Sequence, residues 1–120
     1  DLKGRDAGHA FEHFIFQEIM AYKKLKEKLF DISFWRNKNQ LEVDFVINRA
    51  DYAIEVKISK QVSKSDLKGL IEFCRRHPRA KPIVVSLDDQ RRKISIDEGL
   101  QIMVYPYKEF LDLMWAEKLF

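Results

Sequence analysis

Hydrophobic and polar residues alternate along two neighbouring runs of the chain, residues 41–47 and 52–58. This period of two predicts a pair of half-buried β-strands. Because only the four residues 48–51 separate the runs, we expect an antiparallel hairpin. The hydrophobic positions predicted to share one face are Leu41, Val43, Phe45 and Ile47 in the first strand and Tyr52, Ile54, Val56 and Ile58 in the second.

The rest of the sequence predicts helices and further strands around this hairpin. A first helix carries Phe11, Phe14, Ile15, Ile19, Tyr22, Leu25 and Leu29 on one face. We expect Ser65 to cap a second helix, which ends at His77–Pro78. Short strands are predicted at residues 32–35, 82–87, 93–96 and 100–105, and a last helix from Tyr107. This order predicts a single α/β domain over residues 1–120, with a central mixed β-sheet flanked by helices and a C-terminal helix.

Composition narrows the class of protein. With 120 residues, 46% hydrophobic and 34% charged, the chain has the length and make-up of one soluble globular domain. No apolar run approaches the roughly 20 residues that cross a bilayer, so we expect no membrane contact. The single cysteine, Cys74, excludes a disulfide framework and favours a reducing, cytoplasmic location. Because the first residue is Asp1 and not Met, we expect a fragment of a longer protein.

Two acidic side chains face each other across the predicted hairpin. A four-residue loop pairs residues whose numbers add up to 99, so Asp44 lies opposite Glu55. Like charges at this range destabilise a sheet, and a divalent cation between them would explain the pair. The alternative is an ordinary solvated sheet face, on which Glu42 and Lys57 form a cross-strand ion pair in the same register.

A third acidic residue, Glu12, lies at the edge of the hydrophobic stripe of the first helix. From there its carboxylate can lean towards the sheet and join the facing pair. The helix dipole alone would also favour an acidic residue near the start of a helix. His9 and His13 flank Glu12 and are secondary candidates.

With Glu12, Asp44, Glu55 and Lys57 in these positions, the chain resembles the PD-(D/E)XK, or restriction-endonuclease-like, nuclease superfamily. The resemblance covers nearly the whole chain and implies that superfamily's αβββαβ core. More narrowly, the sequence is similar to the C-terminal domain of predicted bacterial and archaeal AAA+-type ATPases. The segments that carry this similarity are Gly8–Glu12, Phe34–Arg36, Glu42–Val46, Ile54–Lys57 and Ser59. Val43 stands where the superfamily often has its name-giving proline.

The resemblance implies a DNA endonuclease that uses Mg²⁺ (or Mn²⁺) to hydrolyse phosphodiester bonds. Asp44, Glu55 and the backbone carbonyl of Val56 would bind the metal, which prefers oxygen ligands. Lys57 would hold the attacking water or the phosphate, and Glu12 would support the site or a second metal. The resemblance also implies an ATPase domain in the same full-length chain. The sequence at hand contains no Gly-x(4)-Gly-Lys-Ser/Thr loop, so ATP binding would belong to that other domain.

A wider group of basic and polar residues is expected to contact DNA. Clustered basic side chains attract the phosphate backbone without reading its sequence. No aromatic platform for unpaired bases is evident in the sequence, so we expect weak, sequence-independent binding of duplex DNA. The expected contact residues are Arg36, Gln61, Lys64, Arg75, Arg76, Arg91 and Arg92.

Two other functions stay open on the sequence alone. The domain could keep the nuclease-like fold and bind nucleic acid, or regulate the ATPase, without cutting. It could also be a structural oligomerisation domain with Trp35 and Trp115 exposed at the interface. The intact set of Asp44, Glu55 and Lys57 favours the nuclease.

Overall fold

The computed structural model describes residues 4–120 of the chain. Its elements are α1 (Gly4–Leu25), β1 (Ile32–Arg36), β2 (Glu42–Ile47), β3 (Tyr52–Val56), the short 3₁₀ helix η1 (Lys64–Leu67), α2 (Lys68–Arg76), β4 (Lys81–Ser86), β5 (Arg92–Asp97), β6 (Leu100–Pro106) and α3 (Tyr107–Trp115). The six strands form one sheet in the order β1-β2-β3-β4-β6-β5. β4 is parallel to both β3 and β6, and the other neighbours are antiparallel. The predicted mixed sheet with flanking helices and a C-terminal helix is confirmed.

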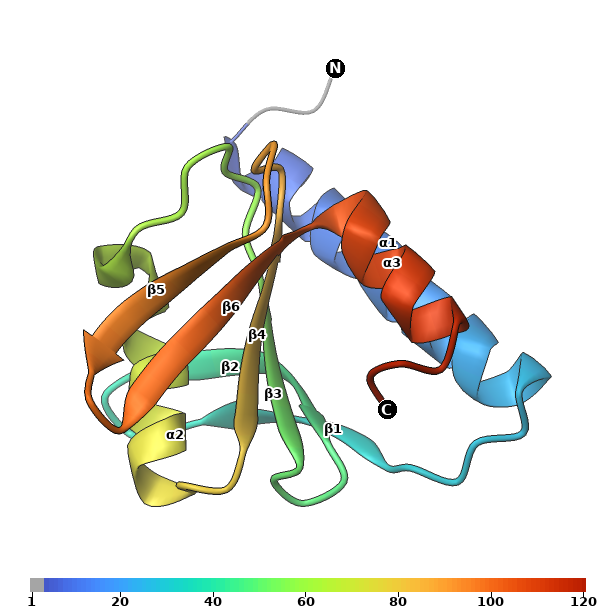
Figure 1. Cartoon of the computed structure of the whole chain (residues 1–120), viewed down its shortest axis with the longest axis horizontal. Helices are drawn as coiled ribbons and strands as arrows, with labels where there is room; N and C mark the ends of the chain where they lie inside the picture. The colour runs from blue at the N-terminus through green and yellow to red at the C-terminus, as the bar shows by residue number, and fades with distance from the viewer. Residues whose placement is uncertain (1–3) are drawn as a thin grey trace.

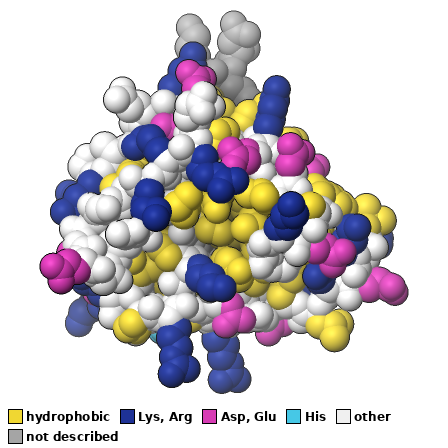
Figure 2. Space-filling view, viewed as in Figure 1, with side chains coloured by type: hydrophobic (Ala, Val, Ile, Leu, Met, Phe, Trp, Pro, Cys, Tyr) yellow, Lys and Arg dark blue, Asp and Glu magenta, His cyan; other side chains and the backbone are white. Residues whose placement is uncertain are grey.

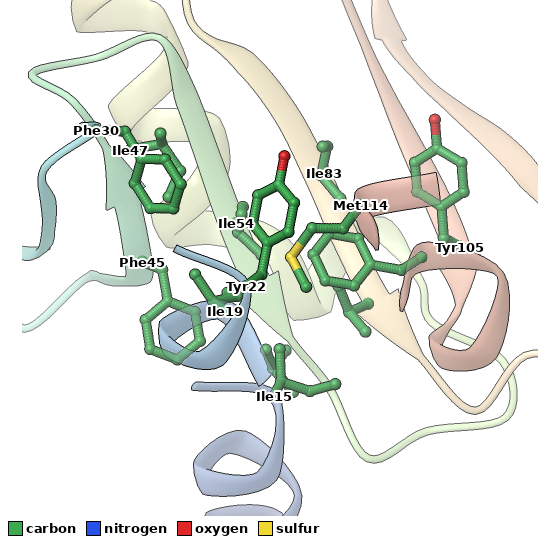
Figure 3. Packing of buried hydrophobic residues seen from close by; sticks show 13 residues of the cluster. Ile15, Ile19, Tyr22, Phe30, Phe45, Ile47, Ile54, Ile83, Tyr105 and Met114 are labelled. Carbon is green, nitrogen blue, oxygen red and sulfur yellow. The ribbon is translucent and has the colours of Figure 1, made fainter. Parts of the chain in front are cut away.

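Helices cover both faces of this sheet (Figure 1). α1 and α3 lie side by side on one face, and α2 covers the other. On the first face, Ile15, Ile19 and Tyr22 of α1 pack with Ile54 of β3 and Met114 of α3 (Figure 3). On the second face the buried cluster includes Val43, Val46, Ala53, Leu67, Leu70, Phe73, Val84, Ile102 and Val104. The sheet is therefore held between two hydrophobic clusters.

The first helix is shorter than predicted. α1 ends at Leu25, and Glu27 adopts a φ of 52°, in the left-handed region that does not continue a helix. Leu25 and Leu29, which we predicted on the buried face, are 71% and 95% exposed. That part of the prediction is wrong.

Within residues 4–120, no helix is both long and apolar enough to cross a membrane.

The second helical segment begins earlier than predicted. Ser63, not Ser65, precedes η1, and its backbone N–H donates to the Asp66 carboxylate over 2.9 Å. This arrangement satisfies one of the amide groups that the start of a helix leaves without a partner. α2 follows from Lys68 and ends at Arg76, just before the predicted stop at His77–Pro78.

The hairpin has the predicted register where its backbones pair. Phe45 pairs with Ile54, and the next two pairs follow in step towards the 48–51 loop. Pairing stops at Phe45 and Ile54, and β2 and β3 diverge beyond that point (Figure 1). Asp44 and Glu55 are the first residues past the last backbone pair.

A β-bulge interrupts the pairing of β1 and β2. Two residues of β2, Asp44 and Phe45, lie opposite the single residue Phe34 of β1. The pairs that flank the bulge are Ser33–Val46 and Trp35–Val43.

The bulge changes which face each residue of β2 joins. Phe45 belongs to the cluster under α1, whereas Val43 packs with Val46 in the cluster under α2. The prediction that Val43 and Phe45 share a face is therefore wrong. Asp44 lines the same surface hollow as Phe45 and Glu12, so the bulge brings Asp44 towards α1.

One end of the sheet collects the predicted active-site residues. Since β3 and β4 are parallel, their carboxyl ends lie together, and antiparallel β2 begins at the same end. The start of α1 reaches this end too, because a Cβ built on Gly8 would lie 3.6 Å from Ile58 Cγ2. The sheet topology therefore brings Asp44, Glu55 and Lys57 close to α1.

The start of α2 packs directly on the backbone of β2. A Cβ built on Gly69 would lie only 2.0 Å from the carbonyl oxygen of Glu42, which is far inside contact distance. Only glycine fits at this crossing, and the crossing fixes the strand two residues before Asp44.

We predict that Gly69→Ala destabilises the domain by roughly 1–3 kcal/mol or more, because backbone must move to admit the methyl group. Urea unfolding measures the change. Gly8→Ala is the matched control, also in a helix, where the new Cβ makes an ordinary 3.6 Å contact and helix propensity improves. Equal effects of the two substitutions would contradict the close approach of α2 to β2.

Candidate metal centre

Two carboxylates complete the backbone hydrogen bonding where β2 and β3 separate. The N–H of Asp44 donates to Glu55 Oε1 over 3.1 Å, and the N–H of Val56 donates to Asp44 Oδ2 over 2.8 Å. Each carboxylate thus acts as the hydrogen-bond acceptor for a backbone N–H, a role that a backbone carbonyl has in a regular β-ladder. This exchange holds the two acidic side chains face to face, as the register predicted.

Burial and mutual repulsion make this pair costly to ionise. Glu55 is buried, and burial raises the pKa of its carboxyl, while the nearby Lys57 opposes the rise. Burial, reinforced by the charge of Glu55, raises the pKa of Asp44 to about 7. A positive charge placed between the two carboxylates would remove this cost.

Lys57 supplies part of that positive charge. Its Nζ lies 3.3 Å from Glu55 Oε2. The cross-strand ion pair between Glu42 and Lys57, considered as the alternative from the sequence, does not form, because Glu42 pairs with Arg36 of β1 instead. Arg36 and Glu42 are direct partners across β1 and β2, which explains the exchange.

Glu12 lies near the pair from the side of α1. It lines the hollow that also contains Asp44 and Phe45. Burial, followed by the charge of Asp44, raises the pKa of the Glu12 carboxyl. The structure therefore places all three predicted carboxylates in one electrostatic environment.

The oxygen atoms left over decide what the site can hold. The N–H of Val56 binds Oδ2 of Asp44, and the other carboxylate oxygen, Oδ1, accepts no backbone N–H of residues 4–120. The carbonyl of Val56 points to the same side of β3 as its N–H, because both groups of a strand residue face one neighbour. Within residues 4–120, no three His, Cys, Asp or Glu side chains are grouped closely enough to hold a metal. Protein ligation would thus rest on two carboxylates and one carbonyl, a sparse oxygen set of the kind that suits Mg²⁺ with several waters.

The residues predicted to contact DNA do not form one patch. Figure 2 shows Lys and Arg side chains spread over the visible face among acidic and hydrophobic ones. Arg75 and Arg76 lie at the end of α2, beside the β5–β6 turn and the 48–51 loop, far from the carboxyl ends of β3 and β4. The others lie near the end of the sheet that carries Asp44, in or beside the strand ends and loops there: Arg36, Gln61, Lys64, Arg91 and Arg92.

The five predicted arginines each have an acidic partner within the chain. The partners are Glu42 for Arg36, Asp97 for Arg75, Glu72 for Arg76, Glu109 for Arg91 and Asp88 for Arg92. Most of these pairs are exposed and can open at little cost to meet a phosphate. Contact with DNA stays a prediction for the whole group.

A protein-family comparison matches most of the chain. Residues 7–110 match the family described as "Domain of unknown function (DUF4143)". The chain belongs to the DUF4143 family. No curated protein matches it significantly.

The DUF4143 domain also resembles a solved structure. The similar chain comes from the refined half-complex of the tetradecameric assembly of Thermococcus gammatolerans McrB AAA+ hexamers with bound McrC. The TM-score is 0.62 at 15% sequence identity, and the match covers 95% of the DUF4143 domain and 33% of the other chain. At this identity the likeness shows the fold alone. The DUF4143 domain spans about a third of that chain's length.

Arg92 of the DUF4143 domain differs from the other arginines in being tied to the interior. Its Nε donates to the buried Asp88 over 2.9 Å, and its Nη2 donates to the carbonyl of Val62. Asp88 also accepts a hydrogen bond from the buried hydroxyl of Ser86. This network joins the loop after β3 to the end of β4. This network was not predicted from the sequence, because the bond from Arg92 to Val62 joins residues that are 30 positions apart.

The two tryptophans considered for an interface pack inside the DUF4143 domain. Trp35 meets Phe73 edge to face with ring centroids 5.5 Å apart. Trp115 does the same with Tyr22 at 5.5 Å, and its Nε1 donates to Glu18. Both are half-buried, so the prediction that they are exposed is wrong.

We predict that Asp44→Asn makes the metal-free domain more stable at pH 8, by about 1–3 kcal/mol. The folded state raises the pKa of Asp44 to about 7, so the folded chain holds that proton more tightly than the unfolded chain, whose aspartates ionise near pH 4. The stabilisation from protonated Asp44 is therefore complete below pH 4 and lost as the pH rises towards 7.

Urea unfolding in EDTA at pH 4, 6 and 8 tests this expectation. The gap between Asp44→Asn and wild type should widen with pH and close at pH 4. Asp89→Asn, at an exposed position three residues past β4, controls for loss of a surface carboxylate. A gap that stays constant with pH would contradict the assignment.

A second prediction separates the two neighbouring arginines. Arg92→Ala should cost roughly 2–4 kcal/mol, because it leaves the buried Asp88 carboxylate without its charged partner. Arg91→Ala breaks a pair of partly exposed side chains and should cost less than about 1 kcal/mol. Urea unfolding at pH 7 measures both, and similar values for the two variants would show that the Arg92 network does not stabilise the fold.

Proposed function

We propose that this DUF4143 domain is a metal-dependent DNA endonuclease of the PD-(D/E)XK superfamily. The observation that carries the proposal is the pair of facing carboxylates, Asp44 and Glu55, held where two strands separate and raised in pKa by burial. A protein gains no stability from ionising such a pair, so a bound cation supplies the simplest reason for it.

The donor set suits Mg²⁺ or Mn²⁺. Asp44, Glu55 and the carbonyl of Val56 would hold the ion through oxygen, and solvent would complete its coordination. When bound, the ion would supply a Lewis acid that activates water and offsets the negative charge that develops on a phosphate. No cysteine or histidine is needed in this set.

Lys57 and Glu12 have separate roles in this proposal. Lys57 stands 3.3 Å from Glu55, so its ammonium can orient the attacking water or bind a phosphate oxygen beside the carboxylates. Glu12, in the hollow beside Asp44, adds a third negative charge and would support the site or a second ion.

An ATPase in the same full-length chain is the second part of the proposal. The sequence resembles the C-terminal domain of AAA+-type ATPases, and the similar solved chain comes from an assembly of AAA+ hexamers. Both likenesses support a domain that works beside an ATPase. We expect duplex DNA as the nucleic acid partner, bound through exposed arginines and lysines without sequence preference.

A second candidate function is a non-cleaving domain that binds nucleic acid or regulates the ATPase. One observation favours it. No three potential metal-ligating side chains are grouped within residues 4–120, so the protein ligands for an ion are few. Metal binding and cleavage therefore need separate tests.

We predict that Mn²⁺ stabilises the wild-type domain and that Asp44→Ala abolishes this effect. An ion that binds only the folded state at 100 times its Kd adds about 2.7 kcal/mol of stability. Titration calorimetry and thermal shift measure binding. Glu42→Gln is the matched control, since Glu42 lies on the same strand but pairs with Arg36 and should leave binding intact. Equal stabilisation of wild type and Asp44→Ala would rule out this metal site.

Cleavage requires a further test in the full-length protein, because the ATPase portion is expected to load the DNA. Nicking of supercoiled plasmid in Mn²⁺ should fall at least about 100-fold in Lys57→Ala while Mn²⁺ binding persists. Lys60→Ala, at an exposed position three residues further on, should cut normally. Wild-type protein that binds Mn²⁺ and DNA but never nicks would favour the non-cleaving domain.

A further inference from the structure

A hollow of about 360 Å³ opens directly beside the carboxylate pair. Glu12 and Asp44 contribute its acidic wall. The rest of its lining is almost entirely apolar and comes from α1, β1 and β2: Phe16, Met20, Ile32, Ser33, Phe34 and Phe45. A ligand that fills it must therefore satisfy a hydrophobic surface and lie next to the proposed metal.

The aromatic residues of this hollow have two different environments. Phe16 and Phe45 stack on each other with centroids 5.7 Å apart, and Phe45 is buried. Phe34 is 75% exposed, more than any other Phe, Tyr or Trp within residues 4–120. Its neighbour Trp35 packs against Phe73 on the α2 face of the sheet. Phe34 lies on the α1 face, where it lines the hollow and its ring stays mostly exposed.

The bulge in β2 puts this ring where the chemistry is expected. Phe34 is the one residue of β1 that faces both Asp44 and Phe45. A phenylalanine this exposed on an edge strand buries little apolar surface on folding and adds a hydrophobic group to an unpaired sheet edge. Its place opposite Asp44 gives it a use as a contact for a ligand bound at the carboxylates.

The two halves of the site limit the chemistry of that ligand. The carboxylates repel an anion unless a cation bridges them, so the polar part of the ligand is a metal-binding anion such as a phosphate. The apolar part must offer a flat surface to an aromatic ring. A nucleotide has both parts, joined by a sugar. A base inside a duplex has no free face, whereas an unpaired base stacks readily on an aromatic side chain.

We propose that the hollow binds an unstacked nucleobase of the strand being cut, with Phe34 as the stacking platform. This inference rests on the proposed function and narrows its substrate to DNA with an unpaired nucleotide beside the scissile phosphate. It departs from the expectation from sequence, in which no aromatic platform for unpaired bases was evident. Phe34 acts as a positioning and specificity residue, because it contacts the base and not the reacting atoms.

Fluorescence anisotropy with a labelled oligothymidine in Mn²⁺ tests the platform. Phe34→Ala should weaken binding about 5- to 160-fold, the range expected for loss of one base–aromatic stack. Phe34→Trp should bind as well as wild type. Leu29→Ala is the control for removing an exposed apolar side chain elsewhere, because Leu29 is 95% exposed and lies outside the hollow. It should leave affinity unchanged.

An oligothymidine with one abasic position completes the test as a double-mutant cycle. With the abasic site at the bound nucleotide, wild type should lose affinity, and Phe34→Ala should lose nothing more. Mn²⁺ titration of Phe34→Ala should match wild type, which shows that the metal site and the fold are intact.

Three results would overturn the proposal. The first is equal binding of oligothymidine by wild type and Phe34→Ala when both bind Mn²⁺. This result would exclude the stacking role of Phe34 but would not contradict the proposed nuclease activity. The second is a wild-type dimer in sedimentation that Phe34→Ala converts to a monomer, because a second copy would then cover the hollow. The third is failure of the wild type to bind Mn²⁺, which would overturn the proposed function itself.

Discussion

The structure of the site depends on one exchange of hydrogen bonds at the point where β2 and β3 part. Asp44 and Glu55 each accept an amide of the opposite strand through a side chain, so the N–H groups of Asp44 and Val56 keep partners where the backbone pairing ends. The same exchange fixes both carboxylates within reach of each other. A hairpin that simply frayed at this end would solvate its charges and lose the site.

The rest of the fold can be understood as support for that separation. Gly69 lets α2 press on the backbone of β2 at Glu42, and the bulge opposite Phe34 brings Asp44 towards α1. On the other strand, parallel pairing with β4 holds Glu55 and Val56 in place. Arg92 ties down the loop that follows β3. This geometry makes the Asp44 carboxyl harder to ionise, as its raised pKa shows. A bound cation would offset the free energy needed to ionise it.

Much of this arrangement could be predicted from the sequence, because short-range rules fix it. The four-residue loop sets the register of the hairpin, and Asp44 and Glu55 face each other as that register requires. The bulge could not be predicted, since Leu41, Val43, Phe45 and Ile47 alternate as regularly as in an unbroken strand. It arises from packing, which draws Val43 to the α2 face. The Arg36–Glu42 pair was missed because it depends on the pairing of β1 with β2, whereas the prediction rested only on the register of the 48–51 hairpin. The bond from Arg92 to the carbonyl of Val62 was missed because it joins residues far apart in the sequence through the tertiary fold.

The central claim is that a divalent cation lies between Asp44 and Glu55. Anomalous diffraction from crystals of the domain soaked in Mn²⁺ tests it most directly, because it locates the ion without relying on activity. We expect one strong peak about 2.1 Å from an oxygen of each carboxylate, on the side of β3 that carries the carbonyl of Val56. A map with no peak there at saturating Mn²⁺, or with its peak at His9 and His13 instead, would contradict it.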